Sequence, residues 1–344
     1  MDIYVISVVL FFIIAFCYIG HRIITKKTDE EFINQYEFLT PEEAHKVIEE
    51  SGYFDHFNTP NLRARLCANV TDCKFKYLKE LMLVDPMEAE AIKWLVEIIL
   101  DRLKENGIST TAFSMTLRFA KFSAKLEGNM PHTHKDVIYF PASYYQNVWK
   151  AYEQSKNKNE DHQYVIKIYG RTLIHELCHI LQRKYESYFI DFYNNKWNFE
   201  QFNESLLDKC ENIFQVSRLN PDGIDVKWLW KNPFSLKNNK KQEYYLLLAI
   251  FKDNHPKFLG DTTNTVYKLD KYSDRYRVSG IEKIEDNVDL NSYFGLKDNN
   301  YHPHEISAEY LSIYMLNHMQ IQTDVNLSAN KGYHLFSDFI SRVV

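Results

Sequence analysis

The segment Arg171–Gln182 constrains the fold of this chain more than any other, because it carries the pattern His-Glu-x-x-His at His175, Glu176 and His179. An α-helix has 3.6 residues per turn, so two histidines four residues apart stand on the same face, one turn from each other. Two imidazoles in that arrangement can bind one metal ion. The glutamate beside the first histidine can act as a base toward a water molecule on the ion.

Apolar residues surround this motif at helical spacing and predict that the helix is mostly buried. They are Leu173, Ile174, Leu177, Ile180 and Leu181. A polar helix face with two hydrogen-bonded histidines is the alternative interpretation. Three polar groups inside a buried helix need compensating partners, and a bound metal ion would provide one.

The motif resembles that of the zincin metallopeptidases. The extension that is typical of metzincins is absent, since Gln182 stands in place of its glycine and Tyr185 in place of its third histidine. A third ligand must therefore come from another segment. The best candidate follows Pro303, a residue favoured in the first turn of a helix, where Glu305 and Glu309 are one helical turn apart.

This second segment resembles the glutamate-bearing helix of gluzincins, in which one carboxylate binds zinc and the next bonds a zinc-binding histidine. The resemblance implies one zinc ion per chain, held by His175, His179 and Glu305. It further implies that Glu176 is the general base and that Glu309 orients an imidazole. The gap between the two motifs is long for this group, and an ordinary solvated acidic face is the alternative interpretation of the second segment.

Composition is that of a folded protein with no affinity for nucleic acid. The chain has 344 residues, a net charge of −5 and 15% aromatic residues, and it contains no basic run. Its five cysteines are odd in number and do not form a disulfide framework, which is typical of proteins in a reducing compartment.

Residues 3–20 form an apolar, uncharged run that is long enough for a transmembrane helix. We therefore expect residues 1–24 to anchor the protein in a membrane by a single pass. Arg22, Lys26 and Lys27 follow this run, so the positive-inside rule predicts a cytosolic location for the C-terminal body. A cleaved signal peptide, and hence a secreted or lumenal protein, is the alternative, but the basic segment that such peptides carry is missing.

The remaining pattern predicts an α+β protein. Residues 25–110 are expected to form a helical N-terminal region, with capping boxes that begin at Thr40 and Asp85. Residues 111–344 are expected to form a catalytic domain with the zincin-like fold, with an insert of strands and loops at about 217–300. In that fold a sheet in the N-terminal lobe precedes the metal-binding helix, and the C-terminal lobe is mainly helical.

Two strands are expected before the metal-binding helix. Residues 111–125 alternate between apolar and polar side chains, which predicts a strand buried on one face only, and residues 137–140 form the second strand. In zincins a peptide substrate lies along an edge strand, and residues 132–140 are the candidate edge here. His132 and His134 share one face of this segment and are expected to be surface histidines near a turn, with a role in substrate binding as the alternative interpretation.

The predicted function is that of a membrane-anchored zinc metallopeptidase acting on a peptide or protein substrate. The missing Gly-x-Met-Glu-Asn signature of exopeptidases favours an endopeptidase. One alternative is an inactive zincin-fold protein that serves as a binding or scaffold protein, and another is a membrane-tethered interaction protein with an accidental motif. The residue that stabilises the oxyanion is open among Tyr301, His302, His304, Tyr310 and His318.

Overall fold

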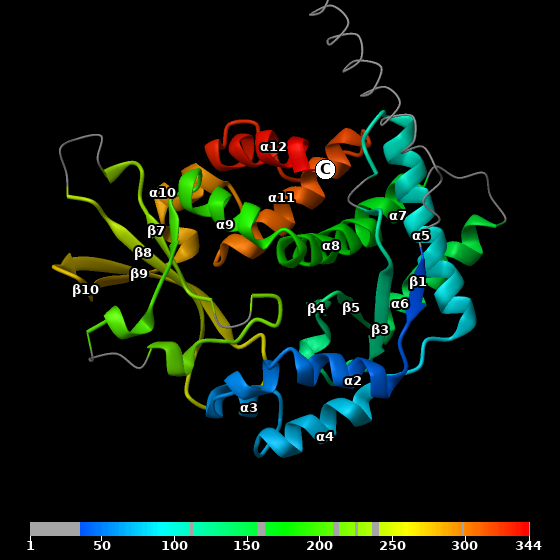
Figure 1. Cartoon of the computed structure of the whole chain (residues 1–344), viewed down its shortest axis with the longest axis horizontal. Helices are drawn as coiled ribbons and strands as arrows, with labels where there is room; N and C mark the ends of the chain where they lie inside the picture. Colours follow the sequence, from blue (N-terminus) through cyan, green and yellow to red (C-terminus); the bar gives the residue numbers. More distant parts are fainter. Residues whose placement is uncertain are drawn as a thin grey trace, which may run out of the picture.

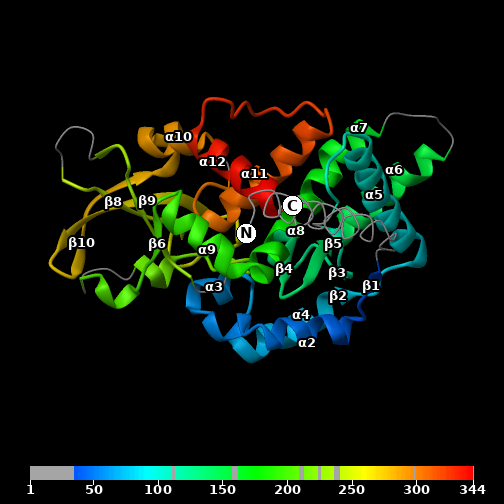
Figure 2. The ribbon, with the colours of Figure 1, turned by 45° about the horizontal axis from the view of Figure 1, so that its top comes forward.

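The computed structural model describes residues 35–110, 113–156, 162–208, 213–223, 226–235, 241–297 and 299–343. The membrane anchor predicted at residues 1–24 lies outside these ranges. Among the residues that are described, no helix is both long enough and apolar enough to span a membrane. The described chain is an α+β protein with two β-sheets on opposite sides of a central helix pair, α8 (Arg171–Lys184) and α11 (Pro303–His318) (Figure 1 and Figure 2).

The first sheet is mixed and has the strand order β1-β3-β5-β4, with β2 also paired to β3. Its strands are β1 (Tyr36–Phe38), β2 (Leu81–Met82), β3 (Leu117–Phe122), β4 (His132–His134) and β5 (Val137–Pro141). β1, β3 and β5 run parallel, whereas β4 is antiparallel to β5 and lies at the edge of the sheet, against α8.

Helices cover both faces of this sheet. On one face Phe119 and Phe140 pack with α5 (Pro86–Glu105), α6 (Ala142–Ser155) and α8. On the other face Phe122 and Tyr139 pack with α2 (Pro41–Glu50) and α4 (Val70–Glu80). The expectation of a strand buried on one face only was therefore wrong. The polar alternation that suggested it lies mostly before β3 begins, and the strand itself is covered on both sides.

The N-terminal part contains the expected helices α2, α4 and α5, together with α3 (Thr59–Ala64). Both predicted capping boxes are present, since the side chains of Thr40 and Asp85 each accept a bond from a backbone N–H of the first turn, and their own backbone N–H groups donate to a glutamate side chain. This part is not purely helical, however, because β1 and β2 join the first sheet. The first sheet therefore contains strands from both sides of residue 110, where the N-terminal region was expected to end.

The second sheet is antiparallel throughout and has the order β10-β9-β8-β7-β6. Its strands are β6 (Phe199–Gln201), β7 (Trp228–Lys231), β8 (Tyr244–Phe251), β9 (Thr262–Tyr272) and β10 (Arg275–Lys283). Strands were expected inside an insert at about 217–300, but the sheet already begins at β6. The C-terminal half is consequently an α/β mixture and not mainly helical.

Further helices pack around the central pair. They are α7 (Gln163–Val165), α9 (Glu186–Asn195), α10 (Val288–Phe294) and α12 (Lys331–Val343). Single turns lie at Tyr53–His56, Glu127–Asn129, Glu204–Leu206, Ile213–Val216 and Ile284–Asp286, and a π-helical turn at Ile166–Gly170 leads into α8. Because α8 and α11 pack directly on each other, the two sequence motifs meet in the middle of the molecule.

Candidate metal centre

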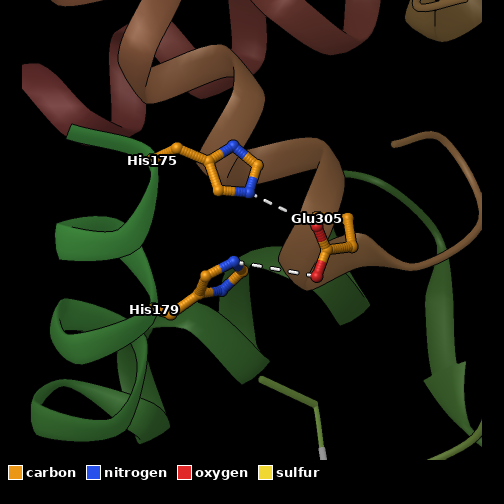
Figure 3. A group of neighbouring side chains, drawn as sticks. All are labelled: His175, His179 and Glu305. Atoms are coloured by element: carbon orange, nitrogen blue, oxygen red, sulfur yellow. Dashed lines mark ion pairs between the residues drawn. The ribbon is translucent and has the colours of Figure 1, made fainter. Parts of the chain in front are cut away.

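Two helices supply the side chains of the candidate site. α8 presents His175 and His179 one turn apart, and α11 brings Glu305 to face both rings (Figure 3). α11 begins at Pro303, and the ring of His302 accepts a bond from the first turn, so Glu305 is held at the start of the helix. The structure thus brings together the three residues that the sequence proposed as ligands.

The distances between these side chains are close to those expected between two ligands of one metal ion. His175 Nε2 lies 3.4 Å from Glu305 Oε2, and His179 Nε2 lies 3.7 Å from Glu305 Oε1. Zinc binds nitrogen and oxygen at about 2.0 to 2.1 Å, so two ligands of a tetrahedral site are about 3.3 Å apart. The observed separations exceed a normal hydrogen bond and are close to this value.

The hydrogen bond from Gln182 determines which nitrogen of His179 is free. His179 Nδ1 lies 2.9 Å from Gln182 Oε1. The amide of Gln182 is oriented by its own donations, 2.9 Å to the His304 carbonyl and 2.7 Å to Ser307 Oγ. An amide oxygen only accepts, so His179 Nδ1 carries the proton and Nε2 has a lone pair. This Nε2 is buried and has no hydrogen-bond partner among the described residues, as a metal ligand requires.

His175 is oriented by a carboxylate from α11. Glu309 Oε2 lies 3.6 Å from His175 Nδ1, on the side of the ring opposite Glu305. Glu309 also pairs with Arg171, one turn before His175 on α8. Glu309 therefore stands where the gluzincin resemblance predicted a carboxylate that orients the imidazole.

Charge around His175 and Glu305 favours a cation between them. Burial alone would lower the pKa of His175, but Glu305 and Glu309 raise it well above its usual value. Burial alone would raise the pKa of Glu305, but His179 and His175 hold it well below its usual value. The carboxylates of Glu305 and Glu309 thus both lie beside the His175 imidazole. A divalent cation bound by neutral imidazoles would balance the same negative charges.

Glu176 lies beside this group without joining it. Its Oε2 is buried and makes no hydrogen bond to any described residue. Burial raises the pKa of Glu176 well above its usual value, and the nearby carboxylate of Asp222 raises it further. A carboxylate with a raised pKa is a stronger base, so this side chain is suited to proton transfer.

The segment 220–222 contributes two more polar side chains to the site. Asn220 donates a 2.6 Å hydrogen bond to Glu305 Oε1. Oxygens of Asp222 and Glu176 lie within 4.8 Å of each other and of a ring nitrogen of His179. The sequence analysis did not single out Asn220 or Asp222, because no local spacing links them to α8 or α11. The contact of Gln182 with His179 could have been predicted from the sequence, since Gln182 follows His179 by three residues on the same helix.

The candidate edge at residues 132–140 forms two strands, β4 and β5, of which only β4 lies at the edge of the sheet, and the outward backbone groups of β4 are occupied. The backbone N–H of Thr133 donates 2.7 Å to Asp222 Oδ1, and Arg183 donates 3.3 Å to the Thr133 carbonyl. A peptide cannot add to this edge in the observed conformation. His132 and His134 are buried, contrary to expectation, because both rings pack against Tyr139 and His134 also packs against Tyr53.

A cleft of about 550 Å³ opens beside the site and is lined by His175, Glu176 and Glu305, among others. Of the five residues considered for oxyanion stabilisation, only Tyr301 lines it. The other four are hydrogen-bonded or packed elsewhere: the Tyr310 hydroxyl with the Phe294 carbonyl, His318 with the Tyr314 carbonyl, His302 with the Val226 carbonyl, and His304 against Trp228.

Comparisons with protein-family models, with curated proteins and with solved structures each gave no match for this chain. The side-chain geometry is therefore the basis for the function proposed below.

Proposed function

We propose that this chain is a zinc-dependent metallopeptidase of the zincin class, similar to gluzincins, with one zinc ion held by His175, His179 and Glu305. The observation that carries the proposal is the buried, unpaired Nε2 of His179, which faces Glu305 while Gln182 holds the proton on the opposite nitrogen. Two histidines and one glutamate form a donor set of catalytic zinc sites, in which the fourth position is open.

A bound zinc ion would supply Lewis acidity toward a peptide carbonyl and lower the pKa of a water molecule. Glu176 takes the proton of the attacking water on its carboxylate and passes it to the departing amine. Tyr301 supports the carbonyl oxygen as it gains charge. Arg218 donates 3.1 Å to the Tyr301 hydroxyl oxygen, which leaves the hydroxyl proton free to point into the cleft.

Membrane attachment is part of this proposal and rests on the sequence alone. The apolar, uncharged run of residues 3–20 supports a single transmembrane anchor, and the basic residues after it support a cytosolic body. Protease protection of the full-length chain in sealed vesicles tests the orientation. Digestion of the body by protease added outside inside-out vesicles is the expected result.

Asp222 favours a second candidate function, that of an inactive zincin-fold protein that binds a partner. A carboxylate this close to His179 can act as a fourth ligand and close the coordination shell, as in structural zinc sites. Its bond to Thr133 also occupies the edge where a peptide would lie in zincins.

The test is the zinc content of the full-length protein and its hydrolysis of a peptide mixture. We expect about one zinc per chain in the wild type and far less in Glu305→Ala, with Glu90→Ala on the exposed face of α5 as a matched control. Zinc retained at the wild-type level in Glu305→Ala would overturn the ligand assignment.

Glu176→Gln separates the two candidate functions. In a peptidase it retains zinc and loses hydrolysis by a factor of about 100 or more, because the general base is gone. If the wild type binds zinc and cleaves nothing, the inactive binding protein is favoured. In that case Asp222→Ala, which opens the coordination shell, distinguishes a latent enzyme that gains activity from a protein without any.

A further inference from the structure

Arg218 is a cation in the cleft that lacks an acidic partner. Its guanidinium donates to the Tyr301 hydroxyl, and its central carbon lies 5.5 Å from the centre of the Tyr301 ring. No acidic side chain in the described ranges forms an ion pair with it. A half-buried guanidinium with donors to spare, in a cleft beside a candidate metal centre, is suited to bind an anion from outside the chain.

Most of the other charges of the cleft wall are compensated by ion pairs within the chain. Apart from the candidate ligand Glu305 and the candidate base Glu176, the acidic residues that line the cleft each have a cationic partner within the chain: Glu127 with Arg65, Glu309 with Arg171, Asp324 with Lys167, and Asp222 with Arg183. Lys297 also lines the cleft and forms no ion pair with a described residue. Outside the ligand Glu305, the two cations Arg218 and Lys297 outnumber the one unpaired carboxylate, Glu176, so the unbalanced charge of the described cleft wall is positive.

The backbone holds Arg218 close to the reacting centre. The Arg218 N–H donates 2.8 Å to the Ala249 carbonyl of β8, and the next N–H donates 2.9 Å to Asn61 Oδ1. Two residues further on, Asn220 bonds the candidate ligand Glu305. Arg218 reaches Tyr301, which precedes Glu305 by four residues. A group bound at Arg218 would thus lie in the same cleft as the scissile bond.

We propose that Arg218, with Lys297 beside the same cleft, binds a carboxylate of the substrate, so that the site selects acidic peptides. This inference rests on the proposed peptidase function, whose substrate class it names. The planar guanidinium can donate two parallel bonds to a carboxylate, which an amide of the same size accepts far less well. The carboxylate can belong to a Glu or Asp side chain or to the C-terminus of the peptide.

The experiment uses the full-length, zinc-loaded protein and pairs of peptides that differ only by Glu or Gln near the cleaved bond. We expect kcat/KM to be about 10- to 100-fold higher for the Glu peptide, the range of a charge-assisted hydrogen bond. Arg218→Gln should bring this ratio close to one, and Arg218→Lys should keep part of it. Arg63→Gln, which removes an exposed charge away from the cleft lining, should leave the ratio as it is.

A second pair of peptides separates the two sources of the carboxylate. A peptide with a free C-terminus is compared with the same peptide as its C-terminal amide, with Gln at the inner position in both. A preference for the free form that Arg218→Gln removes assigns the site to the C-terminus. A preference that follows only the Glu side chain assigns it to an inner acidic residue.

Binding of fluorescently labelled Glu and Gln peptides, measured by anisotropy, distinguishes failure of this inference from failure of the peptidase function. Hydrolysis with no preference for a carboxylate would overturn the inference and leave the peptidase intact. Tighter binding of the Glu peptide without hydrolysis, lost in Arg218→Gln, would support the anion site and overturn the peptidase. A preference that survives in both Arg218 variants would overturn the role of this residue.

Discussion

Gln182 shows how one neutral side chain prepares a metal ligand. Its amide oxygen accepts a hydrogen bond from the Nδ1–H of His179, while its amide N–H groups donate to the His304 carbonyl and Ser307 Oγ of α11. Gln182→Ala should lower zinc affinity by about 10- to 100-fold, as is usual when the partner of a ligating histidine is removed. Competition with a chelator of known affinity measures the zinc affinity. Gln201→Ala, at an exposed position of β6, is the control. Equal affinity in Gln182→Ala and wild type would contradict the role.

His134 makes stability depend on pH. Its ring is fully buried between Tyr53 and Tyr139, and burial lowers its pKa well below the usual value, with further lowering from nearby His132. Below a pH of about 6.5 the unfolded chain binds a proton here that the folded chain does not. The free energy of unfolding should therefore fall by up to about 1.4 kcal/mol per pH unit from this residue as the pH decreases.

His134→Phe keeps an aromatic ring in the same pocket and removes this proton. Urea unfolding of the zinc-free protein at pH 7 and pH 5.5 should show a smaller loss of stability in the variant than in the wild type. Other buried histidines, such as His302 with a pKa lowered to about 4, contribute to both proteins, so the difference between them reports on His134. An identical decrease in the free energy of unfolding in both proteins would contradict this role of His134.

At the scale of elements, an ion pair joins the turn after α3 to the turn before β4. Arg65 and Glu127 are both 4% exposed, and the guanidinium donates 2.9 Å and 3.1 Å to the two carboxylate oxygens. Tyr53 adds a 3.1 Å hydrogen bond to the same carboxylate. The pair fixes one wall of the cleft, since Glu127 also lines it.

Arg65→Met should destabilise the fold by about 3 to 5 kcal/mol, because it leaves Glu127 buried without a counter-charge. The double variant Arg65→Met with Glu127→Met should be less destabilised than the single one, since no isolated charge remains. Urea unfolding curves measure both values, and Lys93→Met in an exposed pair of α5 serves as a control. A double variant as unstable as the single one would contradict this explanation.

Helices and strands of this chain were predictable to different degrees. The capping boxes at Thr40 and Asp85 and the presence of strands within residues 217–300 followed from local patterns, because caps and alternation act over a few residues. The burial of β3 on both faces and the entry of β1 and β2 into the sheet did not. Those features depend on which distant helices cover the sheet, and no local pattern encodes that.

For the whole molecule, the candidate site joins two distant parts of the chain. Ligands from α8 and α11 would be tied together by one ion, so zinc should raise the thermal unfolding temperature. At a free zinc concentration 100 times the dissociation constant, binding adds about 2.7 kcal/mol to the free energy of unfolding. Differential scanning fluorimetry with zinc and with chelator measures the shift, and Glu305→Ala should abolish it. The same shift in that variant would place the stabilising ion elsewhere.

The stabilisation by zinc should also weaken as the pH falls. The pKa of His175 in the metal-free protein is raised well above its usual value, so a proton competes with the metal for this ring over the whole range below that pKa. The shift in unfolding temperature at pH 6 should therefore be smaller than at pH 8. A shift that is independent of pH would argue against His175 as a ligand.

The sequence by itself determined the relation of His175, Glu176 and His179, because a spacing of four residues within one helix sets which side chains share a face. It also indicated Glu305, through the resemblance of its segment to the glutamate-bearing helix of gluzincins. Only the tertiary structure decided that Asn220 and Asp222 complete the site and that Arg218 lines the cleft. These contacts join segments far apart in the chain, and their geometry depends on how the two sheets pack against α8 and α11.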